Sequence, residues 1–240
     1  MDFTLASFNA HWGFGRRGAE RGVQFDVVPL IRSWDADIVV LPESWRDDDG
    51  HGMVDDLADD GYFVETLPMM PLAVRRDRTG SYDAIPRTGM WELAVLTRFE
   101  VKARQEPSLG YLREDPVKRR PALSLTVDID GTAVEVIALH TSSFLFTLAP
   151  LRHLYALKRQ LRDDGPQILA GDFNFWGPPV AMMMRGWDRP VRGATWPAHR
   201  PHSQIDHVLV RNGVVGLSSE VLGATPSDHR PIRARLRLDV

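Results

Sequence analysis

The chain of 240 residues contains no cysteine, so it can form neither disulfide bonds nor thiolate metal sites. It also lacks an apolar run long enough to span a bilayer, and we expect no transmembrane segment. No basic region followed by an apolar stretch precedes the first expected strand, which opens at Asp2. These absences favour a reducing compartment, and we expect a cytoplasmic protein.

The chain also has no large excess of charge of either sign, because its formal net charge is only -3. A chain of this charge has no global basic field that would attract nucleic acid. Cations do gather locally, most clearly at Lys118-Arg119-Arg120, which leaves a local binding patch open. With 43% hydrophobic residues, the chain has enough apolar surface for one domain spanning residues 1–240, and we expect a monomer.

Short apolar runs that adjoin polar clusters are the main feature of the sequence. Four of them end in such a cluster: Leu5–Phe8 before Asn9, Ile38–Pro42 before Glu43, Val134–Leu139 before His140, and Ile168–Gly171 before Asp172-Phe173-Asn174. Two have the reverse order: Asp206-His207 before Val208–Val210, and Ser227-Asp228-His229 before Pro231-Ile232. Runs of this length indicate buried strands. If every cluster lies at one edge of the sheets, the last two strands run antiparallel to the first four, and six distant segments form one site.

The segments between these runs predict helices and hairpins. Apolar residues recur at helical spacing between Val23 and Trp34 and again between Leu154 and Leu161. Asp130-Gly131 is a type I′ turn signal and predicts a hairpin. This order of elements predicts an α/β protein with two packed sheets and helices outside them.

Two further expectations concern the middle of the chain. Residues 92–98 and 101–105 predict a second hairpin, in which two consecutive strands pair with each other. The stretch from Pro68 to Gly89 is polar with little periodicity, and we expect it to cover part of the site.

The chemistry of the clusters favours a hard metal ion and a phosphate. Glu43 follows an apolar strand, where a carboxylate is costly unless it is paired or bound to a metal. Mg²⁺ prefers oxygen ligands, and one or two carboxylates with an amide are enough to hold it. Asp172 and Asn174, two apart in an extended segment, would project from the same side. Asp206 could accept the ring N–H of His229 and fix its tautomer.

These segments, in this order, resemble the endonuclease/exonuclease/phosphatase superfamily, which has the DNase I-like fold. The conjunction that carries the resemblance is Phe8-Asn9, Pro42-Glu43, Gly171-Asp172-Phe173-Asn174, Ile205-Asp206 and Ser227-Asp228-His229, with Ala194-Thr195-Trp196-Pro197 as a further similarity. The resemblance implies a four-layer α/β/β/α sandwich, in which two mixed, mostly antiparallel β-sheets are flanked by helices. It also implies hydrolysis of phosphoesters with Mg²⁺ or Mn²⁺.

The resemblance further implies a role for each cluster. The metal ligands would be Glu43, Asn9 and Asp228. The catalytic residues would be Asp172, which orients or deprotonates water, His229 with its partner Asp206, and His140. The substrate-binding residues would be Asn174, which holds the phosphate, and Tyr111, Arg119 and Arg120, whose register is open. His11 differs from the Asp that abasic-site endonucleases carry there, so the substrate is open.

Three functions remain to be weighed. The leading one is a divalent-metal-dependent phosphodiesterase or phosphatase whose substrate is a small molecule, a lipid headgroup or nucleic acid. The second is a DNA endonuclease or exonuclease, and the third is a non-catalytic binding module that kept the fold. Residues Phe144–Leu148 form an apolar run that either packs beneath the next helix or forms a lip for a greasy substrate, and packing is favoured.

Overall fold

The computed structural model describes residues 1–16, 23–74, 87–143 and 148–239. Its six-stranded sheet has the order β12 (Val214–Val221), β13 (Ile232–Leu238), β1 (Asp2–Ser7), β2 (Ile38–Asp47), β4 (Arg87–Thr97) and β3 (Phe63–Val74). Its five-stranded sheet has the order β11 (Asp206–Arg211), β10 (Gln167–Asp172), β9 (Thr132–His140), β8 (Leu123–Ile129) and β5 (Val101–Gln105). A separate hairpin joins β6 (Ser108–Tyr111) to β7 (Arg119–Pro121).

The two large sheets pack face to face, because strands of both contribute apolar side chains to one core. Val40 and Leu93 of the first sheet and Val136 and Val208 of the second are among the fully buried members of this core. Side chains that alternate along a strand leave a second apolar set on each outer face, and helices cover these sets.

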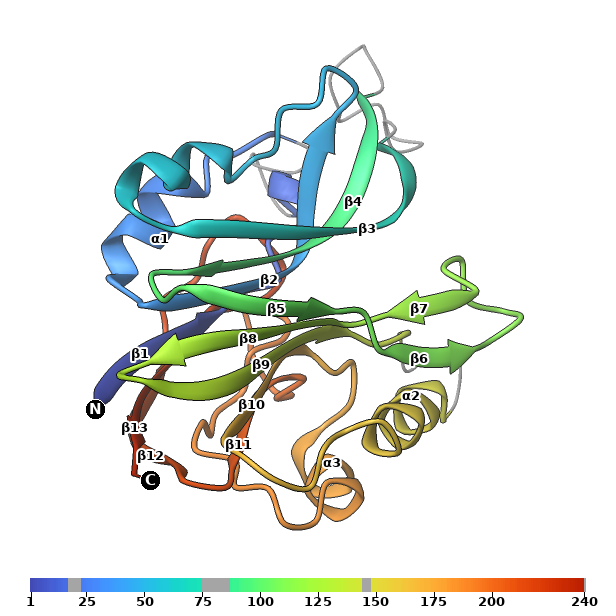
Figure 1. Cartoon of the computed structure of the whole chain (residues 1–240). Coiled ribbons are helices and arrows are strands. Elements are labelled where there is room, and N and C mark those ends of the chain that lie inside the picture. The colour runs from blue at the N-terminus through green and yellow to red at the C-terminus, as the bar shows by residue number, and fades with distance from the viewer. Residues whose placement is uncertain (17–22, 75–86, 144–147, 240) are drawn as a thin grey trace.

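On the outer face of the six-stranded sheet lies α1 (Val28–Trp34), whose Ile31 is buried with Val39. On the outer face of the five-stranded sheet lie α2 (Ala149–Lys158) and α3 (Gly177–Met183), which cover Leu169. Two short 3-10 helices span His11–Gly13 and Asp55–Asp60. Figure 1 shows the resulting four layers, and the predicted α/β/β/α sandwich is confirmed. Among the described residues, no helix has the length and apolar character needed to cross a bilayer.

Strand direction brings the polar clusters to one edge. The pairs β1–β2 and β9–β10 are parallel, so the ends of these four strands point the same way within their sheets. Strand β13 runs antiparallel to β1, and β11 runs antiparallel to β10. The beginnings of β11 and β13 therefore lie beside the ends of the other four, as the sequence predicted.

The predicted hairpin at Asp130-Gly131 is confirmed, since both residues have positive φ (54° and 79°) and join β8 to β9. The predicted pairing of residues 92–98 with 101–105 is wrong. Strand β4 is already hydrogen-bonded to β2 on one side and β3 on the other, so neither of its edges is free. The chain therefore crosses over, and β5 pairs with β8 in the second sheet.

Two other boundaries differ from the prediction. The helix expected from Val23 begins only at Val28, and Val23 is exposed. Of the stretch from Pro68 to Gly89, the described residues 68–74 and 87–89 are strand rather than irregular cover, because β3 extends to Val74 and β4 begins at Arg87, with Leu72 paired to Gly89. Met70 and Leu72 of β3 still pack against the core between the two sheets. Residues 75–86 lie outside the described residues.

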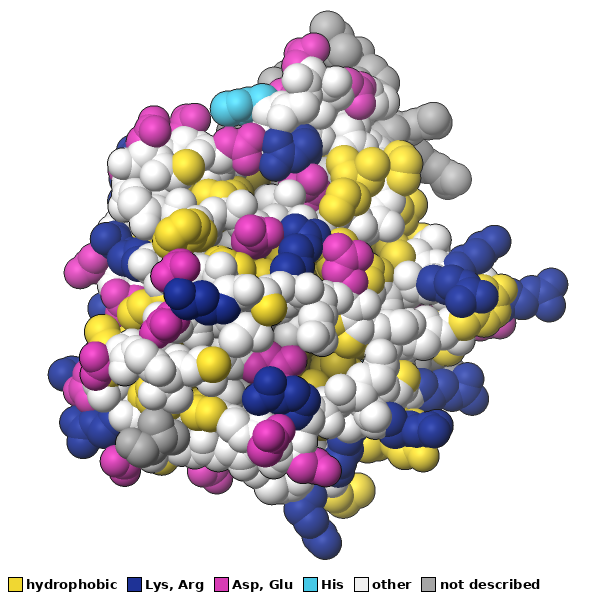
Figure 2. Space-filling view, in the orientation of Figure 1, with side chains coloured by type: hydrophobic (Ala, Val, Ile, Leu, Met, Phe, Trp, Pro, Cys, Tyr) yellow, Lys and Arg dark blue, Asp and Glu magenta, His cyan; other side chains and the backbone are white. Residues whose placement is uncertain are grey.

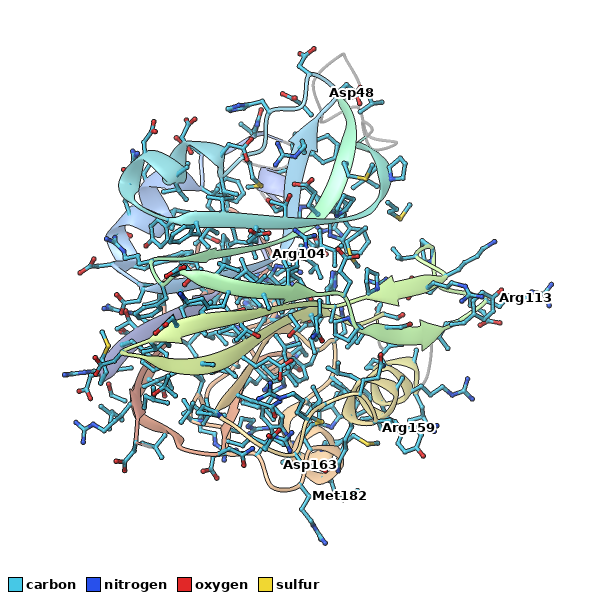
Figure 3. The ribbon with its side chains drawn as sticks, viewed as in Figure 1. Asp48, Arg104, Arg113, Arg159, Asp163 and Met182 are labelled. Atoms are coloured by element: carbon cyan, nitrogen blue, oxygen red, sulfur yellow. The ribbon has the colours of Figure 1, made fainter. Side chains whose placement is uncertain are left out.

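An ion pair on the surface links the two sheets, and basic side chains gather on one side of the molecule. Arg104 of β5 donates to Glu65 of β3 at 2.8 Å and so links the two sheets (Figure 3). In the view of Figure 2, Lys and Arg side chains gather at the right, over the β6–β7 hairpin and α2.

Candidate active site

The six polar segments converge on one cavity of about 550 Å³ at the shared edge of the sheets. It is lined by Glu43, His140, Asp172, Asn174, Asp228 and His229, together with His11, Trp12, Arg16, Pro116, Arg120, Thr141, Ser143, Trp196 and Ile205. His140 and Asp172 end their strands, Asp228 and His229 lie in the loop before β13, and Glu43 lies within β2.

Glu43 enters the cavity from a β-bulge. The register between β2 and β4 shifts between Leu41 and Ser44, so two residues of β2 lie opposite one residue of β4. The Glu43 side chain is only 12% exposed, and its buried Oε2 has no hydrogen-bond partner. Burial, with a further contribution from the charge of Asp228, raises the pKa of Glu43 to about 8. A nearby cation would therefore stabilise the ionised form of this carboxylate.

Asn9 is held by a left-handed turn that follows β1. His11 and Trp12 have φ of 48° and 56°, a conformation that costs about 1 kcal/mol or more for residues other than glycine. This turn brings the His11 amide to Asn9 Oδ1 at 3.0 Å, and Asn9 Nδ2 donates to Asp172 Oδ2 at 3.0 Å. Burial lowers the pKa of His11, whose Nδ1 lies 2.9 Å from the carbonyl of Phe14. Both aromatic side chains of the turn line the cavity.

The segment Gly171-Asp172-Phe173-Asn174 turns sharply at the end of β10. Gly171 has φ of 138°, and a Cβ there would lie 2.0 Å from the carbonyl oxygen of Leu139, so only glycine fits. Asn174 has φ of 47°, so the predicted extended segment is wrong. The turn nevertheless directs both side chains into the cavity, and the Asn174 amide donates to Asp172 Oδ1 at 2.7 Å. Burial raises the pKa of Asp172 to about 7.

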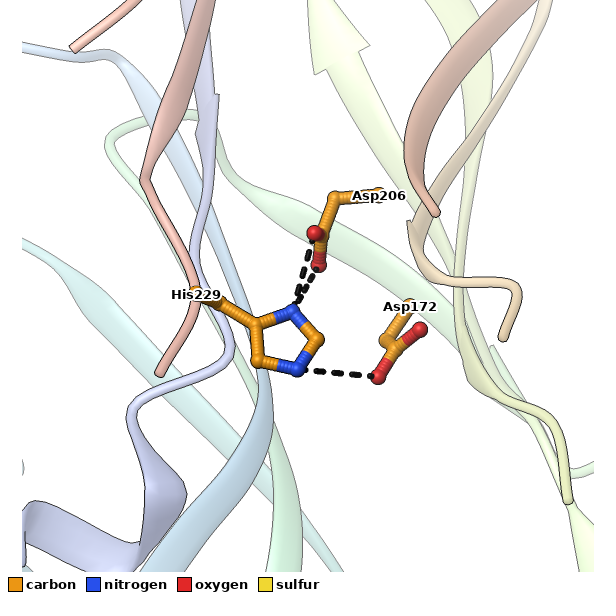
Figure 4. A group of neighbouring side chains, drawn as sticks. All are labelled: Asp172, Asp206 and His229. Atoms are coloured by element: carbon orange, nitrogen blue, oxygen red, sulfur yellow. Dashed lines mark hydrogen bonds and ion pairs between the residues drawn. The ribbon is translucent and has the colours of Figure 1, made fainter. Parts of the chain in front are cut away.

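Asp206 and His229 form the hydrogen-bonded pair that the sequence predicted. His229 Nδ1 lies 2.9 Å from Asp206 Oδ2 and 3.1 Å from Oδ1, and the opposite ring nitrogen lies 3.8 Å from Asp172 Oδ2 (Figure 4). Burial alone would lower the pKa of His229, but the negative charges of Asp206 and Asp172 raise it to about 10. The imidazole is therefore charged at neutral pH, with Nδ1 committed to Asp206 and Nε2 directed toward Asp172.

His140 has the opposite electrostatic state. Its burial, reinforced by the charge of Arg120, lowers its pKa well below the usual value, so the ring is neutral. Asn174 Nδ2 lies 3.0 Å from His140 Nε2, 3.0 Å from the Thr141 carbonyl and 3.3 Å from Asp172 Oδ2. The amide has two N–H groups for these three contacts, and His140 Nε2 also lies 3.4 Å from Asp172 Oδ2 and 3.7 Å from Glu43 Oε1. The Trp91 ring contacts the His140 ring in an edge-type arrangement, with the ring centroids 5.1 Å apart.

Asp228 lies at the mouth of the cavity beside the Glu43 carboxylate that its charge influences. Its Oδ2 is 3.6 Å from Nε of Arg16, a half-exposed side chain that also lines the cavity. The neighbouring Ser227 anchors the segment, since its hydroxyl donates to the Asn9 carbonyl at 2.7 Å and accepts from the His229 amide. The first and last segments of the chain are thus joined at the site.

The three substrate-binding residues predicted outside the clusters are placed differently from the expectation. Arg120 lines the cavity, but its guanidinium is buried and donates to both oxygens of Asp115 at 2.8 and 2.7 Å. Tyr111 and Arg119 are exposed on the β6–β7 hairpin, face each other at 5.9 Å and do not line the cavity. The carboxylate that neutralises Arg120 is five residues away and follows no periodic pattern, so the sequence did not reveal it.

Sequence reasoning also missed groups that the structure adds to the cavity. Trp12 and Pro116 were not singled out, although Trp12 lies only three residues after Asn9, and Arg16 was noted only as part of a local basic cluster with Arg17. Trp196 entered only as part of the similarity of its segment, and it lines the cavity near a cis peptide bond to Pro197. Of the apolar run at Phe144–Leu148, residues 144–147 lie outside the described residues.

The donor set suits a hard divalent cation. The partnerless Oε2 of Glu43 lies in a cavity that also contains the carboxylates of Asp172 and Asp228. Oxygen ligands of this kind favour Mg²⁺ or Mn²⁺ over Zn²⁺. Asp172, Asp206 and His229 form a second grouping, whose ligand atoms all lie within 4.8 Å of one another. In that grouping the oxygens of Asp206 already accept from His229, which leaves Glu43 with its neighbours as the better-fitting ligand set.

Fold and site together define a member of a phosphoester-hydrolysing class. Residues 6–229 match the Endonuclease/Exonuclease/phosphatase family, and the chain belongs to this family. It is 24% identical over 260 residues to the uncharacterized protein YbhP of Escherichia coli K12, with 99% of this chain and 97% of that protein covered.

Solved structures show the same fold. An endonuclease/exonuclease/phosphatase from Beutenbergia cavernae has a TM-score of 0.75 at 22% identity, with 99% of this chain and 72% of that chain covered. The mannosyl-6-phosphatase Bt3783 of Bacteroides thetaiotaomicron has a TM-score of 0.67 at 17% identity, with 98% and 99% covered.

Proposed function

We propose that this protein hydrolyses phosphoesters by in-line attack of water on phosphorus, with Mg²⁺ or Mn²⁺ as its metal. The observation that carries the proposal is one cavity that holds both a buried carboxylate without a partner, Glu43, and an imidazole oriented by a carboxylate, His229 with Asp206. The Glu43 carboxylate can bind a cation, and the charged His229 imidazole can donate a hydrogen bond. In hydrolysis at phosphorus, both kinds of group can offset the charge that develops on the phosphoryl oxygens.

The side chains divide the work by their protonation states. A divalent cation, when held by Glu43, Asn9 and Asp228, supplies positive charge beside the phosphoryl oxygens. Asp172, whose pKa of about 7 suits a general base at neutral pH, accepts the proton of the attacking water as the ester P–O bond breaks, and the departing alcohol oxygen takes a proton from solvent. His229 donates Nε2–H to a phosphoryl oxygen, because its pKa of about 10 keeps it charged. Asn174 and His140 position the phosphoryl group between them.

We further propose a compact, water-soluble phosphomonoester or phosphodiester as the substrate. Besides the acidic groups, the cavity is lined by Trp12, Trp196, Pro116 and Ile205, which suit the organic part of a small ester. The name of the structural neighbour Bt3783, a mannosyl-6-phosphatase, supports a small phosphorylated substrate. The nuclease alternative relied on Arg119 and Arg120, and the charge of Arg120 is neutralised by Asp115. A binding module without activity would not need Glu43, Asp172 and the His229–Asp206 pair together.

A substrate panel tests this proposal. The purified protein is assayed with Mg²⁺ or Mn²⁺ on p-nitrophenyl phosphate, bis-p-nitrophenyl phosphate, a sugar phosphate, a phospholipid, plasmid DNA and an abasic duplex. We expect the soluble esters to be cleaved, and chelator to stop the reaction. Asp172→Asn should lower kcat by roughly 10²- to 10³-fold, whereas Asp128→Asn, on the distant turn of β8, should not change it.

Two results would contradict the proposal. Turnover in excess chelator would show that no metal is needed. An unchanged rate in folded Asp172→Asn would show that Asp172 is not the general base. Faster cleavage of DNA than of every small ester would establish the nuclease alternative instead.

A further inference from the structure

Six cations on the outer side of the molecule have no carboxylate partner among the described residues. They are Arg113, Lys118 and Arg119 of the β6–β7 hairpin and Arg152, Lys158 and Arg159 of α2 and its C-terminal end, and we call them the basic face. All six are exposed, and none has an ion pair with any part of the chain that the structure describes. By contrast, Arg32, Arg46 and Arg104 elsewhere on the surface are each paired with a carboxylate.

The hairpin and α2 form one continuous surface. Gln160, just after α2, donates to the Ser108 carbonyl of β6, and Leu109 is buried in the same cluster as Leu154 and Leu157 of α2. Figure 2 shows the Lys and Arg side chains gathered on this side, and Figure 3 shows Arg113 and Arg159 reaching outward from it. The face therefore concentrates positive charge on a chain whose net charge is -3.

Exposed apolar side chains lie among these cations. Tyr111, Leu148 and Tyr155 are 58%, 59% and 56% exposed, and Met182 of α3 is 78% exposed. Leu148, Arg152, Tyr155 and Arg159 follow one another at helical spacing, so apolar and basic side chains alternate along one stripe of α2. Met182 adjoins the stripe, since it lines a hollow of about 530 Å³ together with Tyr155, Lys158 and Arg159.

We infer that this face docks the protein on an anionic lipid surface. Cations that no described carboxylate neutralises are attracted to negatively charged headgroups, and apolar side chains among them gain by burial at the boundary with the acyl chains. Nucleic acid would use the same charges, but Leu148 and Met182 can neither stack on a base nor donate to a phosphate. Their exposure favours a lipid surface as the partner.

The inference does not depend on the proposed hydrolase activity. None of the six cations lines the catalytic cavity, so each can be changed without touching the site. The same hairpin loop does reach the cavity rim through Pro116. A docked molecule would therefore hold its cavity close to the lipid surface, whatever the substrate.

Vesicle co-sedimentation tests the inference. The full chain is mixed with vesicles of phosphatidylcholine alone or of phosphatidylcholine with phosphatidylglycerol, at low and at physiological salt. We expect binding only to the anionic vesicles, weakened by salt, and a drop of about tenfold or more for the double variant Arg152→Glu/Arg159→Glu. Tyr155→Ser/Met182→Ser should also weaken binding, because it removes apolar contact without changing charge.

Matched controls separate this face from bulk charge. Lys102→Glu/Arg235→Glu removes the same charge from β5 and β13 and should bind like the unaltered protein. Equal loss in this control, or no binding to anionic vesicles at low salt, would overturn the inference. Tighter binding to a single-stranded oligonucleotide than to anionic vesicles, abolished by Arg152→Glu/Arg159→Glu, would make nucleic acid the partner instead. Turnover of a soluble ester, measured in parallel, reports on the hydrolase proposal separately.

Discussion

His229 Nδ1 lies 2.9 Å from Asp206 Oδ2, although 22 residues separate the two in the sequence. The contact commits one ring nitrogen to a buried carboxylate and leaves the other facing Asp172 at 3.8 Å. The charge of Asp206 is also a main reason why the pKa of His229 is raised to about 10. One hydrogen bond thus sets both the orientation and the protonation state of the imidazole.

This pair gives the first prediction. His229→Ala should lower kcat by roughly 10²- to 10³-fold, because a donor to the charge that develops in the transition state is lost. Asp206→Asn should cause a smaller loss, since the imidazole keeps its place but loses its charge partner. Steady-state kinetics on a soluble ester, with circular dichroism to verify folding, would measure both. A folded His229→Ala protein with full activity would overturn the role assigned to this residue.

The second prediction concerns metal affinity. Glu43→Gln should reduce the rise in melting temperature that Mg²⁺ or Mn²⁺ causes, because a neutral amide replaces the charged ligand. Glu92→Gln is the matched control: it removes a buried carboxylate of the same sheet, which pairs with Arg46 at 3.0 Å outside the cavity. This control should lower the melting temperature itself but keep the shift with metal. If Glu43→Gln keeps the full shift, Glu43 is no metal ligand.

The third prediction separates a structural from a substrate-binding role of Arg120. Arg120→Met should lower the free energy of unfolding by about 3 to 5 kcal/mol, because it leaves the buried Asp115 carboxylate uncompensated. A phosphate-contacting arginine would instead raise KM at nearly unchanged stability. Chemical denaturation and KM, measured on the same protein, distinguish the two. Arg104→Met, which breaks a partly exposed ion pair, should cost about 1 kcal/mol or less.

The fourth prediction concerns stability at acid pH. His153 is buried on α2, and burial lowers its pKa from 6.5 to about 4. The unfolded chain therefore takes up a proton at this residue more readily than the folded protein does. Its contribution to stability is present above pH 6.5 and is lost as the pH falls toward 4, by at most on the order of 3 kcal/mol.

The variant His153→Asn tests this dependence. The amide can still accept from the Ser142 backbone amide, which lies 3.3 Å from His153 Nδ1, but it does not titrate. The free energy of unfolding of this variant should fall less between pH 6.5 and 4 than that of the unaltered protein. His51→Asn, at an exposed turn, should leave the slope unchanged. An equal slope in all three proteins would contradict the prediction.

The sequence by itself determined the buried strands that carry the site and the polar residues that adjoin them, although β2 continues past Glu43 to Asp47 and β3, β6, β7 and β12 were not predicted. Apolar runs such as Ile38–Leu41 and Ile168–Ala170 are fully buried, and burial on both faces imposes this pattern on any sequence. Once those strands lie in two sheets, the polar residues that adjoin their apolar runs, including Glu43 and Asp172, lie around one cavity. The Asp130-Gly131 turn was readable for a similar reason, because positive φ restricts the choice of residues locally.

Only the tertiary structure decided the features that depend on which strand edges and which charged groups already have partners. Strand β5 joins the second sheet because β2 and β3 fill both edges of β4, and no local pattern records that. Arg120 binds Asp115 rather than facing the cavity as a free cation, because both are buried together and a buried charge needs a partner. The unequal protonation of His140 and His229 likewise follows from burial and from neighbours that strand order brings together, not from the histidines themselves.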